Sequence, residues 1–273
     1  MIVNGRKIAK EILEGVRKDV SGLGRVPVVR AITVAPARAT VSYLSMKQKR
    51  AKDAGLSLEI VRLPDDASTD AVIAALAAPG ADALLVQLPL PDAIDTKAVL
   101  DAIPLERDAD VLSTAAHHAF EEGGDALLPP VVDAVREILM RSHVTIEDAQ
   151  AAVVGNGWLV GEPVTTWLLL NRAAVTVVTR EMGDLNELKT ADIVVLGAGS
   201  PGLVKPEHVR HGVALIDAGT SESGGAIVGD ADPACADVAA VFTPVPGGVG
   251  PIAVACLFRN AAKLALRKAG KPL

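Results

Sequence analysis

Aromatic residues are nearly absent from this chain. Its 273 residues include three Phe, two Trp and one Tyr, or 2%, although 50% of the residues are hydrophobic. The core must therefore be built from Val, Leu, Ile and Ala, a composition that favours buried parallel strands covered by helices. The length is compatible with one large domain or two domains of ordinary size.

Cysteine is scarce as well. Cys235 and Cys256 lie in apolar stretches and show no CxxC or Cys/His spacing, so we interpret both as buried free thiols in a reducing cytosol. The histidines show no metal-ligand spacing with carboxylates, so we predict no metal site.

The sequence also lacks a long basic run, an apolar signal core and a run that approaches a membrane span. With a net charge of −6 and no ladder of aromatic and basic residues, no nucleic-acid partner is expected. The first residues lead directly into an amphipathic pattern. We therefore expect no membrane partner and a cytoplasmic location.

Helix and strand patterns alternate in the first half of the chain. Apolar residues recur at helical spacing from Ile8 to Val20, which predicts a helix over residues 5–21. A second helix is expected from Thr40, as its N-cap, to Gly55. Further strands are expected over 27–35, 56–64 and 81–91, and further helices over 69–78 and 95–104. The alternation indicates a parallel sheet with helical crossovers.

A second α/β domain follows a bridging helix at 129–144. Strands are expected over 150–157, 174–180, 191–199 and 212–219, and helices over 161–173 and 249–271. This order is typical of a mononucleotide-binding sheet. We therefore predict a two-domain α/β protein whose second domain is a Rossmann-type dinucleotide-binding domain.

Two glycine-rich turns follow strands of this second domain. Only Gly197-Ala-Gly-Ser-Pro-Gly202 fits GxGxxG, but Pro201 has no N–H and no long helix follows. Residues 155–161 follow the opening strand and lead into a helix near Pro163, so amides and the positive helix end can face phosphate. The predicted cofactor contacts are Gly155, Asn156, Gly157, Val160, Gly161, Arg180, Gly199 and Thr220.

The nucleotide preference depends on two neighbouring residues. Arg180 can meet a ribose 2′-phosphate, which favours NADP, whereas Glu181 can accept a hydrogen bond from a 2′-hydroxyl, which favours NAD. We predict NADP as the cofactor, with NAD as the alternative.

The single tyrosine, Tyr43, stands four residues before Lys47. On a helix these two side chains lie on one face. Taken alone, the pair is more typical of a packed tyrosine beside a solvated lysine than of a catalytic site.

Four segments occur in a specific order and spacing. They are Tyr43-Leu-Ser-Met-Lys47, Val86-Gln-Leu-Pro-Leu-Pro91, the loop at 155–163, and Thr243-Pro-Val-Pro-Gly-Gly-Val-Gly-Pro251. Over nearly its whole length the chain resembles the bifunctional methylenetetrahydrofolate dehydrogenase/cyclohydrolase family. The resemblance implies a folate-binding catalytic domain of residues 1–139 plus 250–273 and a dinucleotide-binding domain of residues 140–249. It also implies a C-terminal helix that returns to the N-terminal domain, and a homodimer.

The resemblance implies a pair of reactions in one-carbon metabolism and purine biosynthesis. The family oxidises 5,10-methylenetetrahydrofolate with NAD(P)+ to the methenyl form, and then hydrolyses it to 10-formyltetrahydrofolate. The resemblance assigns folate packing to Tyr43, catalysis to Lys47, and hydrogen bonds to the lysine and the pterin side to Gln87. A lysine in a partly desolvated site loses its proton more easily and can then activate water.

The resemblance also assigns the remaining folate contacts. Asp110 matches the aspartate that holds the pterin, with Asp108 as its near rival. Gly247, Gly248 and Pro251 belong to the segment that passes beside nicotinamide and folate, where glycines let the backbone approach a ligand closely.

Several positions depart from the family pattern. Val111 stands in place of a glycine, Val131 in place of the threonine of Pro-Cys-Thr-Pro, Asn156 in place of an arginine and Ala253 in place of a threonine. Two alternatives therefore stay open: a dehydrogenase acting on another small substrate, and a folate- or dinucleotide-binding protein that has lost one or both activities. The retained Tyr43 motif favours catalysis.

Overall fold

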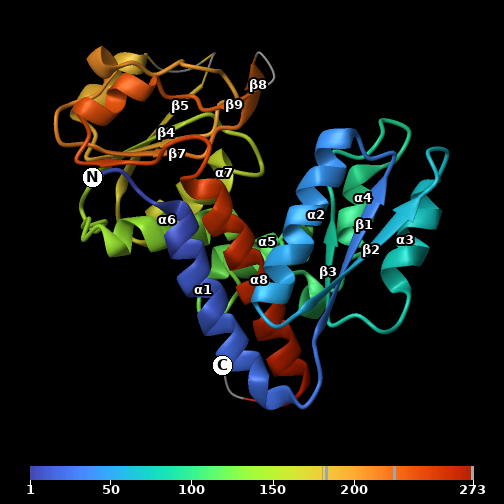
Figure 1. Ribbon diagram of the computed structural model, residues 1–273. Helices are drawn as coiled ribbons and strands as arrows, with labels where there is room; N and C mark the ends of the chain where they lie inside the picture. Colours follow the sequence, from blue (N-terminus) through green and yellow to red (C-terminus); the bar gives the residue numbers. More distant parts are fainter. Residues whose placement is uncertain (180, 182–183, 224–225, 272–273) are drawn as a thin grey trace. The chain divides into compact units, whose positions relative to one another are not determined.

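The computed structural model describes residues 1–179, 181, 184–223 and 226–271 (Figure 1). The chain forms two compact units, one of Met1–Ala9 with Val131–Ala253 and the other of Lys10–Pro130 with Val254–Leu273. We call them the 131–253 unit and the 10–130 unit. Helices α1 (Gly5–Val20) and α8 (Val249–Lys268) contribute residues to both. The functional domain bounds predicted above stay a prediction.

The 10–130 unit is built on a three-stranded parallel sheet of order β2-β1-β3. Its strands are β1 (Val28–Val34), β2 (Ser57–Leu63) and β3 (Ala83–Val86). Its other helices are α2 (Arg38–Asp53), α3 (Thr69–Ala77), α4 (Thr96–Asp101) and α5 (Thr114–Glu122), with short 3₁₀ segments η1 (Ser21–Leu23) and η2 (Leu105–Arg107). The chain adds a further parallel bridge, from Leu84 to Asp108, at the β3 edge.

The two faces of this sheet have different coverings. Ile32 and Leu84 pack with residues of α3 and α4 in one buried cluster. Side chains alternate along a strand, so Leu85 and Gln87 point to the opposite face. Figure 1 shows α2 on one side of the sheet and α3 on the other. Alternation thus directs Gln87, the residue after β3, toward the side of α2.

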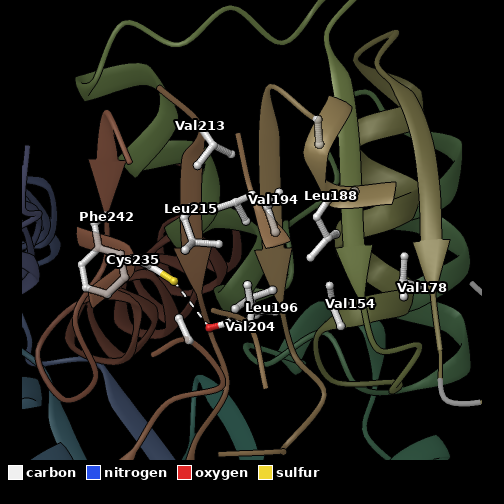
Figure 2. Close-up of a cluster of buried hydrophobic side chains, with 14 residues drawn as sticks. Val154, Val178, Leu188, Val194, Leu196, Val204, Val213, Leu215, Cys235 and Phe242 are labelled. Carbon is white, nitrogen blue, oxygen red and sulfur yellow. Dashed lines mark hydrogen bonds between the residues drawn. The ribbon is translucent and has the colours of Figure 1, made fainter. Parts of the chain in front are cut away.

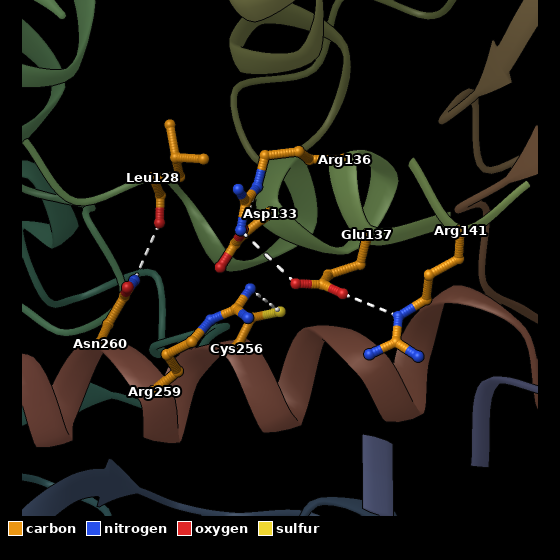
Figure 3. A network of polar contacts seen from close by, with 8 residues as sticks. All are labelled: Leu128, Asp133, Arg136, Glu137, Arg141, Cys256, Arg259 and Asn260. Atoms are coloured by element: carbon orange, nitrogen blue, oxygen red, sulfur yellow. Dashed lines mark hydrogen bonds and ion pairs between the residues drawn. The ribbon is translucent and has the colours of Figure 1, made fainter. Parts of the chain in front are cut away.

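The C-terminal helix packs on the N-terminal half of the chain, as predicted. The buried Asn260 side chain donates to the backbone oxygens of Ala109 (3.1 Å) and Leu128 (2.8 Å), the second of which is visible in Figure 3. Near the helix end, Arg267 donates to the backbone oxygen of Asp125 (2.6 Å). These bonds are consistent with the two-domain prediction, in which the last helix belongs to the N-terminal domain.

By length and composition alone, α8 is apolar enough to cross a membrane, with a mean hydropathy of 1.4 in its best window. This is weak evidence for a membrane span, because a mostly buried core helix passes the same test. Of that window, 72% is buried inside the protein. A core helix covered on most sides needs the same apolar composition, which accounts for the pattern.

The 131–253 unit contains a five-stranded parallel sheet of order β10-β7-β6-β4-β5. The strands are β4 (Gln150–Val154), β5 (Ala174–Val178), β6 (Ile193–Leu196), β7 (Ala214–Asp217) and β10 (Val241–Phe242); the antiparallel pair β8 (Ser221–Ser223) and β9 (Ala226–Val228) lies outside it. The helical elements are α6 (Pro130–Arg141), α7 (Gly161–Leu170), η3 (Leu185–Thr190), η4 (Pro206–His208) and η5 (Pro233–Asp237). The strand order reverses between β4 and β6, the position at which open α/β sheets bind ligands beyond the carboxyl ends of the strands.

Aliphatic side chains fill one face of this sheet. Val154, Leu196, Leu215 and Phe242 belong to one buried cluster, seen in Figure 2, while α7 packs against the strands from the other face. Cys235 lies in the same cluster, and its thiol contacts the Val204 carbonyl oxygen at 3.4 Å. Both cysteines are buried and neither forms a disulfide, as predicted.

Most element positions follow the sequence prediction. The N-cap of α2 is Ala37, and Thr40 lies inside the helix, so the predicted cap was wrong. The side chain of Ala37 has no oxygen to accept a bond, so a cap could not be found there from composition. Helix α5 was not predicted at all, although the Ser113 side chain caps its start, and strands β8, β9 and β10 were not predicted either.

Candidate active site

Helix α2 and the end of β3 bring Lys47, Tyr43 and Gln87 together. The Lys47 Nζ donates to Gln87 Oε1 at 3.1 Å and lies 4.8 Å from the centroid of the Tyr43 ring, one helical turn away. Gln87 Nε2 donates to the Leu88 carbonyl oxygen at 2.8 Å, which fixes the amide with its oxygen toward the ammonium. An amide oxygen and an aromatic face both stabilise an ammonium group.

Burial changes the ionisation of these groups. Lys47 is 6% exposed, and loss of solvent lowers the pKa of its ammonium, with the Asp110 charge acting in the opposite direction. Tyr43 leaves 42% of its surface accessible, yet enough protein surrounds the phenol to raise its pKa to about 12. The site therefore holds a lysine that loses its proton more readily than a solvated lysine, beside a tyrosine that stays neutral.

Asp110 lies on a turn that Asp108, the alternative candidate for the pterin contact, holds in place. Asp108 is buried, and its Oδ2 accepts hydrogen bonds from the amides of Leu112 (3.0 Å) and Ser113 (2.8 Å). Asp110 itself is partly exposed; desolvation raises the pKa of its carboxyl to about 6, with the Lys47 charge lowering it and the Asp108 charge raising it. The geometry separates the two carboxylates: Asp108 stabilises the turn, and Asp110 interacts electrostatically with the lysine.

Val111 adopts a left-handed backbone conformation on this turn, with φ of 57°. A β-branched residue is strained there, whereas glycine is not. The glycine that the family resemblance expects at this position thus has a physical reason. Here the strain is retained beside Asp110.

The loop at 155–161 lies at the carboxyl end of β4, next to β6. Gly155 has φ of 96°, and a Cβ there would lie 2.6 Å from the Gly197 carbonyl oxygen. A Cβ on Gly161 would collide with the Gly155 carbonyl oxygen. At Gly157 a Cβ would meet none of the described atoms within 4 Å. Two glycines therefore allow close backbone packing, and the third faces open space.

This loop leads directly into α7. The helix begins at Gly161, and the Val160 side chain gives no cap to its amides in the described part of the chain. Among the described residues, the amides of Asn156 and Gly157 have no hydrogen-bond partner either. In the first turn of α7 the Glu162 amide donates to the Gly157 carbonyl oxygen at 3.1 Å and Pro163 has no N–H, so the amides available to an anion here are those of the loop before the helix.

The GxGxxG loop at 197–202 is occupied by the protein itself. The carboxylate of Asp230 accepts from the amides of Ala198 (2.7 Å), Gly199 (3.0 Å) and Ser200 (2.6 Å). These are the donors that a phosphate would otherwise take. The literal motif is thus filled by a side chain, and Gly199 faces a carboxylate.

A second buried carboxylate organises the adjacent loops. Asp217, the last residue of β7, accepts from the amides of Gly219 (2.9 Å) and Ala231 (2.8 Å). Desolvation raises its pKa to about 6, with these backbone hydrogen bonds acting in the opposite direction. Thr220, predicted as a cofactor contact, is exposed and directly follows Gly219, whose amide donates to Asp217.

The glycines of the Thr243–Pro251 segment pack closely within the 131–253 unit. The Gly5 amide donates to the Gly247 carbonyl oxygen at 3.0 Å, and the Gly248 amide donates to the Pro244 carbonyl oxygen at 2.7 Å. Gly247 has φ of 111°, and a Cβ at Gly248 would lie 2.7 Å from that same Pro244 oxygen. Pro251 lies in the first turn of α8. Gly247, through its positive φ, and Gly248, through its close packing, are therefore required by the fold of the segment itself.

Arg180, a predicted cofactor contact, lies outside the described residues. Asp217 and Asp230, which hold the loops of the 131–253 unit, were not predicted. The signal that could have identified Asp217 is an aspartate at the carboxyl end of a buried strand, as in Leu-Ile-Asp217. In the part of the chain that is described, no cluster of three His, Cys, Asp or Glu residues has the arrangement of a metal site.

Two family models match the chain. Residues 3–110 match the tetrahydrofolate dehydrogenase/cyclohydrolase catalytic domain, and residues 129–269 match the NAD(P)-binding domain of the same family. The bifunctional protein FolD of Thermus thermophilus is 34% identical over 270 residues, covering 97% of this chain and 96% of the relative. The FolD protein of Halothermothrix orenii is 37% identical over 273 residues, covering 96% of each. The chain belongs to the tetrahydrofolate dehydrogenase/cyclohydrolase family.

As a member of this family it is a bifunctional methylenetetrahydrofolate dehydrogenase and methenyltetrahydrofolate cyclohydrolase, which decides between the alternatives left open above. Solved structures of the family confirm its two-domain fold. The bifunctional FolD enzyme of Campylobacter jejuni has a TM-score of 0.94 and 27% identity, covering 98% of this chain and 99% of that one. The FolD enzyme of Trypanosoma brucei, solved with NADP and an inhibitor, has a TM-score of 0.90 and 33% identity over 98% of both chains.

Proposed function

We propose that Lys47 is the general base of the hydrolytic step in this dehydrogenase/cyclohydrolase, and that Tyr43, Gln87 and Asp110 hold the folate beside it. The single observation that carries the proposal is the buried Lys47 ammonium, 3.1 Å from Gln87 Oε1, with a pKa lowered by desolvation. A lowered pKa gives the amine a larger neutral fraction near pH 7. The neutral amine can accept a proton from water as the water attacks the methenyl carbon.

The neighbouring side chains keep the amine available for this reaction. The Gln87 oxygen accepts one N–H, which fixes the direction of the nitrogen lone pair once the proton has left. The Tyr43 ring offers its accessible face to a planar pterin, since 42% of the residue is exposed. The Asp110 carboxylate can accept hydrogen bonds from the pterin N–H groups.

NADP is the cofactor that we propose for the dehydrogenase step. The residues fit a dinucleotide: the amides of Asn156 and Gly157 before α7 and the open space at Gly157 can accept a pyrophosphate, while Gly155 and Gly161 keep the loop compact. When bound, the oxidised nicotinamide supplies the acceptor for a hydride from the methylene carbon. NAD stays the alternative, because Asn156 stands in place of an arginine.

We further propose the functional domain division of residues 1–139 plus 250–273 and residues 140–249. The catalytic-domain match at residues 3–110 and the start of the NAD(P)-binding match at residue 129 support the first boundary, whereas the second match extends to residue 269. The assignment of residues 250–273 to the catalytic domain is supported instead by the hydrogen bonds from Asn260 to Ala109 and Leu128. A homodimer in the cytoplasm, as in the family resemblance, completes the proposal. Sedimentation analysis of the purified chain tests the dimer.

The decisive experiment replaces Lys47 with Met, which keeps the length of the side chain and removes the amine. We expect the hydrolysis of methenyltetrahydrofolate, followed by its absorbance, to fall roughly a hundredfold or more, as for loss of a positioned general base. Lys49→Met is the matched control, because Lys49 is exposed on the same helix. Wild-type hydrolysis by the Lys47 variant, with folate still bound in calorimetry, would contradict the proposed role.

A further inference from the structure

Asp230 is fully buried, and its carboxylate lies inside the 197–202 loop. One oxygen, Oδ2, accepts from the amides of Ala198 and Gly199, and the other, Oδ1, accepts from the amide of Ser200. Across the part of the chain that is described, these three amides have no other acceptor. A single side chain therefore sets the course of three consecutive peptide groups.

The segment that carries Asp230 is itself fixed in place. The Val204 amide donates to the Asp230 carbonyl oxygen at 3.0 Å, and the neighbouring Ala231 amide donates to the Asp217 carboxylate at 2.8 Å. The space around the Asp230 carboxylate is filled as well, because a Cβ on Gly219 would collide with it. The carboxylate thus reaches the loop from a defined position, with no room to turn away from the three amides.

The backbone that Asp230 holds is in direct contact with the 155–161 loop. A Cβ on Gly155 would lie 2.6 Å from the Gly197 carbonyl oxygen and 3.0 Å from the Ala198 Cα. The two backbones therefore pack against each other with no side chain between them. A shift of Ala198 away from its present position would remove the surface against which Gly155 is packed.

The position of Gly155 decides where the next amides of its loop point. The proposed pyrophosphate contacts are the amides of Asn156 and Gly157, the two residues that follow it. A hydrogen bond weakens when its N–H group is tilted away from the acceptor. The support that Gly155 receives from the neighbouring loop is therefore also support for the two amides that would bind phosphate oxygens.

We infer that Asp230 is a positioning residue of the dinucleotide site. By holding the amides of residues 198–200, its carboxylate fixes the backbone on which Gly155 packs, and so aims the following amides at the pyrophosphate. Asp230 acts through this contact and does not touch the dinucleotide. The inference rests on the proposed place of the pyrophosphate at the 155–161 loop.

Steady-state kinetics of the full-length enzyme tests this role. Asp230→Asn keeps the size of the side chain, but an NH₂ group replaces one acceptor oxygen and faces a backbone N–H. We expect the KM for NADP+ to rise roughly tenfold, as for a loop that is in its binding conformation only about a tenth of the time. The dehydrogenase kcat should stay within about twofold of wild type, because bound dinucleotide selects the competent loop. Hydrolysis of methenyltetrahydrofolate needs no dinucleotide and should be unchanged.

Two further variants accompany this measurement. Asp232→Asn is the matched control, because Asp232 caps η5 through the Ala234 amide at 2.9 Å and Asn caps a helix as well as Asp does. Its KM for NADP+ should equal that of wild type. Gly197→Ala removes no polar group, but its methyl would collide with the Val160 side chain and move the two loops apart. It should raise the KM as well, so it tests the contact even if Asp230→Asn folds poorly.

The results separate positioning from stability. A lower kcat with an unchanged KM for NADP+ in Asp230→Asn would mean a smaller folded fraction and would overturn the inference, as would an equal rise of KM in Asp232→Asn. Gly157→Val tests the place of the pyrophosphate independently. If Gly157→Val raises the KM but Asp230→Asn and Gly197→Ala do not, the inference alone fails. If none of the three raises it, the assignment of the 155–161 loop fails too.

Discussion

Substitutions at Gly155 and Gly157 separate the folding of the glycine loop from its binding of a dinucleotide. A Cβ at Gly155 would lie 2.6 Å from the Gly197 carbonyl oxygen, and φ there is 96°. Backbone strain of this kind costs about 1–3 kcal/mol, and forcing an atom into a packed site costs about 1–3 kcal/mol more. We therefore expect Gly155→Ala to lower the free energy of unfolding by about 3 kcal/mol or more.

Gly157 has neither constraint among the described residues, because φ is not positive and a Cβ would meet no atom within 4 Å. Gly157→Val should change stability by less than about 0.5 kcal/mol, as for most unconstrained surface substitutions. Its side chain would fill the space in front of the unpaired amides of Asn156 and Gly157. Losing one charge-assisted hydrogen bond costs about 1.5–3 kcal/mol, so NADP+ affinity should fall roughly ten- to hundredfold.

The assays are chemical denaturation for stability and calorimetric titration with NADP+ for binding. A variant at Gly199 of the other loop, Gly199→Ala, serves as the comparison for binding only, since Asp230 already takes its amide and the φ of 62° makes an alanine strained there. Normal NADP+ binding by Gly157→Val would show that the pyrophosphate lies elsewhere. A Gly155→Ala protein as stable as wild type would refute the packing argument.

Three further predictions concern the 10–130 unit. Val111→Gly should cost about 1 kcal/mol, whereas Val29→Gly, at the same 1% exposure, should cost about 2–4 kcal/mol, because only the first relieves a φ of 57°; denaturation curves check the difference. Folate affinity should fall as the pH drops through about 6, where Asp110 gains a proton, and Asp110→Asn should remove that pH dependence in a titration series. The pKa of Asp82, lowered from 3.8 to about 2 by its Arg25 and Lys268 partners against an opposing effect of burial, corresponds to at most about 2.5 kcal/mol of stability. Since those partners are about half exposed, we expect about 1 kcal/mol, present above pH 4 and lost as the pH falls toward 2, and absent in Asp82→Asn denaturation curves.

Periodicity was enough to place most of the fold. The alternation of apolar strands and amphipathic helices gave both sheets, because buried parallel strands leave long aliphatic runs in the sequence. The cap at Ala37 was missed because an alanine side chain gives no capping signal, whereas α5 was missed although Ser113 caps its start. A local sequence pattern predicts only the local structure of its own segment.

The candidate site was less predictable from residues alone. The spacing of Tyr43 and Lys47 placed them on one face, but the approach of Gln87 depends on a contact 40 positions away along the chain. The pairing of Asp230 with the GxGxxG loop spans 30 or more positions, and through it the loop amides bind a carboxylate of the protein instead of a phosphate. Such long-range polar contacts are set by the topology of the sheet, which no short pattern contains.

The pKa shifts of Lys47 and Asp110 have the same main cause, which is burial, and opposite directions. Burial lowers the first and raises the second, and each charge holds the other closer to its ordinary value. The methenyl substrate carries a positive charge over its two nitrogens. A bound cation disfavours the Lys47 ammonium and favours the Asp110 carboxylate. Under the proposed function, binding of the methenyl substrate therefore favours the neutral Lys47 amine. In the free enzyme Lys47 keeps its proton, because the Gln87 oxygen and the Tyr43 ring stabilise the ammonium.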